Sequence, residues 1–118
     1  MSDIAPEDAK ILTLARGARL RAHSPHTGIT EGAAVRDSDG RTYAAATVEN
    51  ADPALTTSAL RGAVAAAASS GARAFEAAAV VTDVPLSDTD VAVLREFGAG
   101  TPVLVAGPDG VLLETRHT

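Results

Sequence analysis

The stretch TVENADPALTTSALR, from Thr47 to Arg61, contains the connection that decides the fold. Its first residues end a strand-like segment predicted over residues 41–49. Its last residues lie in an Ala-rich helix predicted over residues 55–70. Hydroxyl side chains near the start of this segment suit an N-cap, and Gly71 suits the C-cap. The stretch therefore predicts a strand that leads into a helix.

The residues before this stretch predict a helix and a β-hairpin. Pro6 and the two acids after it suit a first helical turn, and apolar residues at three- and four-residue spacing extend the helix over residues 5–23. The sequence DSDG at residues 37–40 suits a tight turn between strands over residues 29–36 and 41–49. We therefore expect these two strands to pair.

The residues after the stretch predict a central strand and three further elements. The apolar run at residues 75–82 is typical of a strand that is covered on both faces. The last three elements are a helix capped by Ser87 or Asp88 that ends at Phe97, and strands over residues 102–107 and 111–115. The order αββαβαββ, in 118 residues of which 46% are hydrophobic, indicates one compact domain over residues 1–118.

The charge of the chain excludes one class of partner. The net charge is −5 at pH 7, whereas proteins that bind nucleic acid gather Lys and Arg on one face. We therefore expect no nucleic-acid partner. Arg16, Arg19 and Arg21 cluster on the first predicted helix, and we interpret them as a solvated helix face.

The composition also indicates a compartment. No segment approaches the roughly 18 consecutive apolar residues of a membrane span, and the first residues, MSDIAPEDAK, lack the apolar run of a secretory signal. We therefore expect a cytoplasmic protein that does not associate with a membrane. The chain contains no cysteine, which excludes disulfides and thiolate metal sites.

Several segments resemble those of the cytidine deaminase family. One is TVENA at residues 47–51, which resembles the family's N-V-E-N-A. Two others are SPHTGITEGAAV at residues 24–35, which resembles A-P-Y-S-N-F-x-V-G-A-A-L, and VLREFG at residues 93–98, which resembles Q-V-L-R-E-F-G. The strand before the family's second zinc motif and its terminal hairpin are similar to residues 75–83 and 101–110. The resemblance implies an α/β fold, a three-layer α/β/α sandwich with a five-stranded mixed sheet.

The resemblance also places the family's zinc ligands and catalytic glutamate on residues of this chain. The zinc ligand of C-A-E-R falls on Ser58, and the two cysteines of P-C-G-A-C-R fall on Ser87 and Asp90. The catalytic glutamate falls on Leu60. Neutral hydroxyl groups are poor zinc ligands and leucine cannot transfer a proton. We therefore expect no metal, no cofactor and no catalysis, and interpret the chain as not an enzyme.

The nucleoside pocket that the resemblance implies is weakened. The family's Asn and Glu that hold the ribose fall on Thr47 and Glu49, and the aromatic that stacks on the pyrimidine falls on Ile29. The candidate ligand-binding residues are Glu49, Asn50, Thr47 and Ile29. A carboxylate at a strand end is also a common acceptor that stabilises loops, so both roles stay open for Glu49.

Two replacements suggest how the altered site is stabilised. The arginine after C-A-E remains as Arg61, while Asp90 stands at one ligand position. Because a partly buried guanidinium without a partner is costly, we predict an ion pair between Arg61 and Asp90. Leu60 is expected to fill the volume of the glutamate, the zinc and its water.

Three functions remain open. The first is a catalytically inactive homologue, a pseudoenzyme that acts as a scaffold or interaction subunit through the small-residue helix at residues 55–70. The second is a sensor with a modified pyrimidine nucleoside pocket around Glu49, Asn50 and Ile29. The third is an enzyme of different chemistry, for which the sequence names no residues. The resemblance implies a homo-oligomer, either a dimer or a tetramer, and a further protein partner is also considered.

Overall fold

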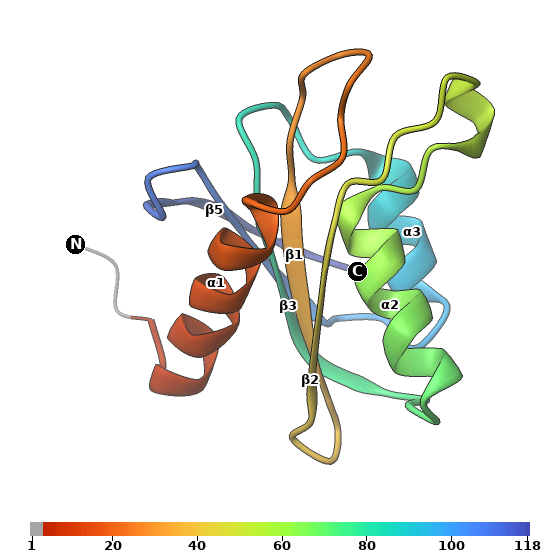
Figure 1. The fold of residues 1–118 in the computed structure, drawn as a ribbon. Coiled ribbons are helices and arrows are strands. Elements are labelled where there is room, and N and C mark those ends of the chain that lie inside the picture. Colours follow the sequence, from red (N-terminus) through yellow and green to blue (C-terminus); the bar gives the residue numbers. More distant parts are fainter. Residues whose placement is uncertain (1–3) are drawn as a thin grey trace.

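The protein is a three-layer α/β/α sandwich. The structure, a computed structural model, describes residues 4–118. A five-stranded sheet is covered by α1 on one face and by α2 and α3 on the other (Figure 1). The elements are α1 (Pro6–Arg19), β1 (Gly32–Asp37), β2 (Thr42–Ala46), the 3₁₀ turn η1 (Pro53–Leu55), α2 (Ala59–Ser69), β3 (Phe75–Val81), α3 (Asp88–Arg95), β4 (Pro102–Ala106) and β5 (Leu112–His117). The predicted order of helices and strands is confirmed.

The sheet is mixed, as the resemblance implied. Its strand order is β2-β1-β3-β4-β5, and β3 and β4 run parallel while the other neighbouring strands run antiparallel. The segment Ala77–Val81 of β3 is buried, which confirms the prediction of a central strand. Because β3 and β4 are parallel, their carboxyl ends lie at the same edge of the sheet, and α2 and α3 begin at this edge (Figure 1).

The two faces of the sheet bury separate apolar clusters. Residues of β1 and β3 alternate between them, because successive side chains of a strand point to opposite faces. Val35 and Val80 belong to the cluster under α2 and α3, whereas Ala34 and Val81 belong to the cluster under α1. Many of the buried side chains are alanines, so the helices must approach the sheet closely to exclude water.

Gly32 is where α1 approaches the sheet most tightly. A Cβ atom at this residue would lie 2.0 Å from the carbonyl oxygen of Ala15 and 2.4 Å from the backbone nitrogen of Arg19. Both of these atoms belong to the helix backbone, which cannot move aside as a flexible side chain can. Glycine at the start of β1 therefore allows the last turns of α1 to lie directly on the strand.

The first helix and the second hairpin strand end earlier than predicted, and the first hairpin strand begins later. The helix predicted over residues 5–23 ends at Arg19, because the backbone nitrogen of His23 donates to Thr47 O at 2.9 Å and so pairs with the chain beyond β2. The strand predicted over residues 29–36 begins only at Gly32. The strand predicted over residues 41–49 ends at Ala46, after which Val48 pairs with Thr57 instead.

The later elements differ at their ends in a similar way. The helix predicted over residues 55–70 begins only at Ala59, because backbone hydrogen bonds of 2.9 Å in both directions between Val48 and Thr57 hold Thr57 extended. The third helix ends at Arg95 rather than Phe97, and the last strand runs on to His117 through its pairing with β4. None of the helices in residues 4–118 is long and apolar enough to cross a membrane.

We predict that Gly32→Ala destabilises the protein by about 2–3 kcal/mol, because the added methyl group forces α1 away from the sheet. Urea unfolding followed by circular dichroism measures this change. Gly17→Ala is the matched control: it lies in α1 with no atom within 4 Å of its Cβ position, and it should stabilise the helix by about 0.5–1 kcal/mol. A Gly32→Ala variant as stable as the wild type would contradict the close contact.

Candidate functional site

The candidate site lies where α2 and α3 begin, beside the carboxyl end of β3. A serine caps each helix: Ser58 Oγ accepts from the backbone nitrogen of Arg61 at 3.3 Å, and Ser87 Oγ accepts from that of Thr89 at 3.1 Å. Serine suits the start of each helix, because its hydroxyl satisfies a backbone N–H that has no partner within the helix. Two of the three predicted zinc-ligand positions are therefore helix caps.

A side-chain hydrogen bond joins the two helix starts. Ser58 Oγ donates to Asp90 Oδ1 at 2.8 Å, and Asp90 lies in the first turn of α3 with only 6% of its surface exposed. A hydrogen bond to a carboxylate is among the stronger ones in proteins, and a buried carboxylate needs such a partner. Ser58 thus caps α2 and holds α3 against it.

Leu60, two residues after Ser58, is a core residue of α2. Its side chain is 1% exposed and belongs to the apolar cluster between the sheet and the helices α2 and α3, together with Val64, Val80 and Val91. This placement agrees with the expectation that Leu60 packs as a core residue. The resemblance places the family's catalytic glutamate at this residue, and here the position carries a hydrocarbon side chain in the core.

The predicted ion pair between Arg61 and Asp90 is not formed. Arg61 is exposed, and the ion pairs found within residues 4–118 do not include it. Successive helix residues are rotated by about 100°, so with Leu60 pointing into the core the side chain of Arg61 leaves toward solvent. Only the backbone of Arg61 contacts the site, through its bond to Ser58.

Glu31 and Thr82 also belong to the site, and the sequence analysis missed both. Thr82 Oγ1 donates to Glu31 Oε2 at 2.9 Å. Burial raises the pKa of Glu31; the hydrogen bond from Thr82 opposes this, and the negative charges of Asp90 and Asp83 raise it further. A perturbed carboxyl group in such a place is a candidate functional group. The signal was an acid directly before the apolar start of β1, a place where a charged side chain is unusual.

Glu49 fixes a loop, and its hydrogen-bond partners are not residues of the helix starts. Its Oε1 accepts from the backbone nitrogens of His26 at 2.6 Å and Thr27 at 3.0 Å, and its Oε2 accepts from Thr27 Oγ1 at 2.5 Å. These hydrogen bonds, led by that of the Thr27 side chain, lower the pKa of Glu49 below its usual value. The carboxylate is therefore charged at neutral pH and has a loop-stabilising role.

A hollow of about 230 Å³ lies beside Glu49. It is lined by His26, Thr27, Glu49, Asn50, Ala51, Pro53 and Thr56. Two of the four candidate ligand-binding residues, Glu49 and Asn50, thus line one hollow. Thr47 does not line it: it is 7% exposed, and its Oγ1 accepts from the backbone nitrogen of Glu31 at 3.0 Å. Ile29 is 42% exposed and also lies outside the lining.

The residues at the zinc-ligand positions do not fit a zinc ion. A catalytic zinc site needs three nitrogen, sulfur or carboxylate ligands and a place for water. Here Asp90 supplies one carboxylate, while the hydroxyls of Ser58 and Ser87 are engaged as caps. Residues 4–118 hold no group of three or more His, Cys, Asp or Glu side chains arranged to bind a metal. No step through zinc is therefore derived for this site.

We predict that Ser58→Ala destabilises the protein by about 2–3 kcal/mol, because it removes a cap and leaves Asp90 without its partner. Ser87→Ala is the matched control: it removes a cap alone and should cost about 1 kcal/mol. Asp90→Asn retains an acceptor for Ser58 and should cost less than Ser58→Ala. Urea unfolding measures all three, and equal losses in the two serine variants would show that the bond to Asp90 contributes nothing.

Comparisons with known proteins agree on a family. The family model described as cytidine deaminase-like matches residues 4–110. A cytidine deaminase of Sporosarcina psychrophila is 34% identical over 111 residues, which cover 90% of this chain and 82% of that protein.

Solved structures show the same fold. The cytidine deaminase of Burkholderia pseudomallei superposes with a TM-score of 0.81 at 28% identity, over 92% of this chain and 89% of that one. The cytidine deaminase of Mycobacterium tuberculosis superposes with a TM-score of 0.76 at 27% identity, over 92% of this chain and 87% of that one. The fold that the sequence implied is therefore confirmed.

The names of these relatives correct one expectation. The replaced residues led us to interpret the chain as not an enzyme, yet the similar proteins are named cytidine deaminases, which are enzymes. That finding contradicts the interpretation, which rested on individual side chains alone. Since the family model spans residues 4–110 and a relative is 34% identical, the chain belongs to the cytidine deaminase-like family.

Proposed function

We propose that the chain binds a pyrimidine nucleoside in the hollow beside Glu49. The relatives are named for cytidine, and Glu49 stands where the resemblance places a ribose contact. The observation that carries the proposal is a charged carboxylate, fixed by three hydrogen bonds, on the lining of a hollow of about 230 Å³. The hollow is also of the right order of size for a single nucleoside.

The lining offers both kinds of polar group that a nucleoside requires. A carboxylate oxygen can accept two hydrogen bonds, and Glu49 Oε2 accepts one, from Thr27 Oγ1. It retains capacity for a sugar hydroxyl. Asn50 Oδ1 accepts from the backbone nitrogen of Asp52 at 2.9 Å, so its amide nitrogen is the group left for a ligand acceptor. Pro53 supplies an apolar wall.

The hollow is also held in shape before any ligand enters. Glu49 ties down the backbone of His26 and Thr27, and Ser24 Oγ donates to Ile29 O at 2.6 Å across the same loop. On the other side, Asp52 caps the turn η1 by accepting from the backbone nitrogen of Ala54 at 3.0 Å. A preorganised site loses less conformational entropy on binding, which favours affinity.

We predict a saturable rise of the melting temperature when the purified chain is titrated with cytidine, uridine or deoxycytidine, because a ligand that binds the folded state stabilises it. Glu49→Gln should weaken binding about tenfold or more, since it removes a charged acceptor. Asn50→Asp should weaken it by removing the amide donor, while it retains the acceptor for the backbone nitrogen of Asp52. Glu96→Gln, an exposed glutamate on the end of α3, is the matched control and should bind as the wild type does.

The pH dependence of binding gives a second readout. Because the pKa of Glu49 is lowered from 4.5, the residue stays charged as the pH falls to that value. The contribution of Glu49 to affinity should therefore be constant from pH 7 to about 5 and should decline only below the ordinary range of glutamate. The absence of any shift at millimolar nucleoside, or an equal shift in Glu49→Gln, would contradict the proposal.

A second candidate function is that of an interaction subunit, which the outer face of α2 favours. The helix buries Leu60, Ala63 and Val64 against the sheet, whereas Ala65 and Ala66 are exposed. Small exposed side chains let a second backbone approach closely. This supports assembly of copies of the chain into a dimer or tetramer through α2, which would also give the protein a role as a scaffold for a further partner.

We predict that Ala66→Glu lowers the mass of the protein measured by light scattering, because a charge on the outer face of α2 would be buried without a partner. The wild type should have a mass of two or four chains at about 100 μM. Ala92→Glu places the same charge on the exposed side of α3 and should leave the mass unchanged. A wild type with the mass of one chain at that concentration would contradict assembly.

A further inference from the structure

The last strand, β5, forms one edge of the sheet. Within residues 4–118 it pairs with β4 alone, at the end of the order β2-β1-β3-β4-β5 (Figure 1). Its register with β4 is regular from Glu114 to His117 and shifts at a bulge before Glu114. An edge strand presents unpaired backbone groups that can bond to a further strand.

The register shows which backbone groups of β5 are free. In an antiparallel pair, residues that exchange backbone hydrogen bonds with their opposite alternate with residues that do not. Thr118 N donates to Thr101 O at 3.0 Å. The next residue of β4, Pro102, has no N–H and lies opposite His117. By this alternation the N–H and C=O groups of His117 and Thr115 point away from β4. Hydrogen bonds of loops and side chains within residues 4–118 do not reach these groups either.

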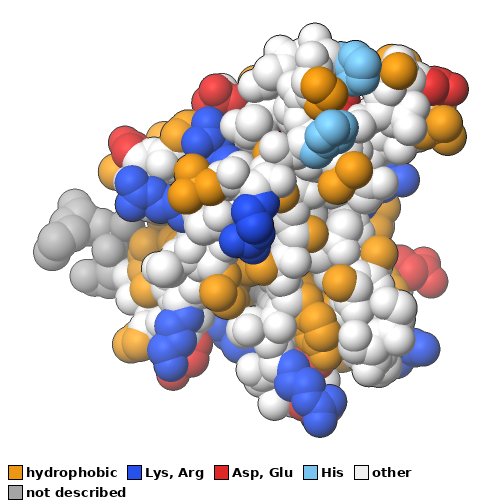
Figure 2. All heavy atoms as spheres, viewed as in Figure 1, with side chains coloured by type: hydrophobic (Ala, Val, Ile, Leu, Met, Phe, Trp, Pro, Cys, Tyr) orange, Lys and Arg blue, Asp and Glu red, His pale blue; other side chains and the backbone are white. Residues whose placement is uncertain are grey.

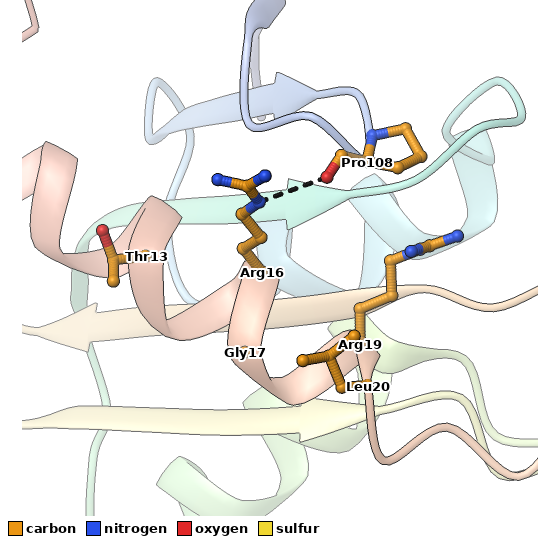
Figure 3. Close-up of a pocket in the computed structure, with 6 residues that line it drawn as sticks. All are labelled: Thr13, Arg16, Gly17, Arg19, Leu20 and Pro108. Atoms are coloured by element: carbon orange, nitrogen blue, oxygen red, sulfur yellow. Dashed lines mark hydrogen bonds between the residues drawn. The ribbon is translucent and has the colours of Figure 1, made fainter.

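The hairpin that carries this edge is fixed at both ends. At its turn, Arg16 Nε of α1 donates to Pro108 O at 3.2 Å, as Figure 3 shows. Toward the other end, Arg116 Nη1 donates to Leu86 O at 2.9 Å, and the same side chain forms an ion pair with Asp88. The edge is therefore presented in a defined conformation, which lowers the entropy cost of binding.

Glu114 and Arg116 give this edge a charge pattern that suits a second copy of the same strand. They carry opposite charges on either side of Thr115 and lie on one face, with Arg116 Nε 3.8 Å from Glu114 Oε1. When two such strands pair antiparallel with Thr115 opposite Thr115, each Glu114 lies opposite the Arg116 of the other copy. Opposite charges directly across two strands stabilise their pairing.

The neighbouring registers lack this match. The free backbone groups belong to alternate residues, so the pairing can shift only in steps of two residues. One such shift places Glu114 opposite Glu114, and the other places Arg116 opposite Arg116. Like charges directly across two strands are destabilising. The charges therefore favour one register, which is centred on Thr115.

We propose that β5 pairs antiparallel with the β5 of a second copy of this chain and joins the two sheets into one. Around a two-fold axis, the two Thr115 residues exchange backbone hydrogen bonds and a Glu114–Arg116 pair lies on either side. At each margin, His117 of one copy lies beside Leu113 of the other, which is 68% exposed in the single chain. The interface is separate from the outer face of α2 and from the nucleoside hollow.

Protection of the edge explains less of this pattern. Charged side chains on an edge strand discourage pairing with other strands, and lysine is the usual choice. That role requires charge, but it does not require two opposite charges at this spacing. Among the described residues, those on the face shown in Figure 2 carry their hydrophobic side chains in separate groups with polar and charged ones between them. That face offers no extended apolar surface to a second copy.

Cross-linking through an introduced cysteine tests the register. The chain contains no cysteine, so any disulfide of Thr115→Cys joins two copies. Opposite residues of a hydrogen-bonded pair have Cα atoms about 5.5 Å apart, a distance that a disulfide spans. With oxidised glutathione, Thr115→Cys should form a dithiothreitol-sensitive dimer at least about tenfold faster than Thr42→Cys, because pairing raises the effective concentration of the thiols. Thr42 is an exposed residue of β2, the other edge strand.

A charge change in the same background tests the Glu114–Arg116 pairs. Glu114→Lys should slow the cross-linking of Thr115→Cys about fivefold or more at low salt, since it turns two attractions into repulsions. Glu96→Lys, at the exposed end of α3, changes the net charge equally and should leave the rate unchanged. Ala66→Glu should also leave the rate unchanged, so this interface is tested apart from that of α2.

Equal rates for Thr115→Cys and Thr42→Cys, or an equal effect of Glu114→Lys and Glu96→Lys, would overturn the proposal. A faster reaction of Thr115→Cys that Glu114→Lys slows and Glu96→Lys does not would support it, whether or not the chain assembles through α2. The melting temperature of each variant, measured by circular dichroism, checks that it is folded.

Discussion

The contact between α1 and β1 at Gly32 is the constraint on which the arrangement of the molecule depends. Because no side chain separates the helix from the strand, the backbone of Arg19 lies against the sheet at a fixed place. The helix ends at that residue, and the following loop has to turn back toward Thr47. This geometry places the arginines of α1 beside the β4–β5 turn and brings Thr27 to Glu49.

The sequence was sufficient to predict the order of the elements and the central position of β3. These features depend on periodicity and on turn residues, which are local properties of the chain. The ends of the elements were less predictable, because tertiary pairing decides them. His23 leaves the first helix to bond with Thr47, and Thr57 is held extended by Val48 instead of joining α2. Neither partner is visible from local propensity.

The site was predicted in part for the same reason. The resemblance to the family pattern placed Ser58 and Asp90 in one site, and in the structure their side chains are hydrogen-bonded. The sequence analysis nevertheless predicted Arg61 as the partner of Asp90. That ion pair does not form because neighbouring residues of a helix point in different directions, and the burial of Leu60 leaves Arg61 exposed to solvent. Glu31 was missed because its role arises from Thr82, which lies 51 residues away in the sequence.

The many alanines that allow the layers to lie close together also affect how the protein responds to temperature. The heat capacity of unfolding grows with the apolar surface that becomes exposed, and an alanine exposes much less of it than a leucine or a phenylalanine. Of the twelve buried apolar residues on β1, β3 and β4, six are alanines, namely Ala33, Ala34, Ala77, Ala78, Ala79 and Ala106, so the increment per residue is small. The free energy of unfolding should therefore curve gently with temperature, and stability should be retained over a broad thermal range.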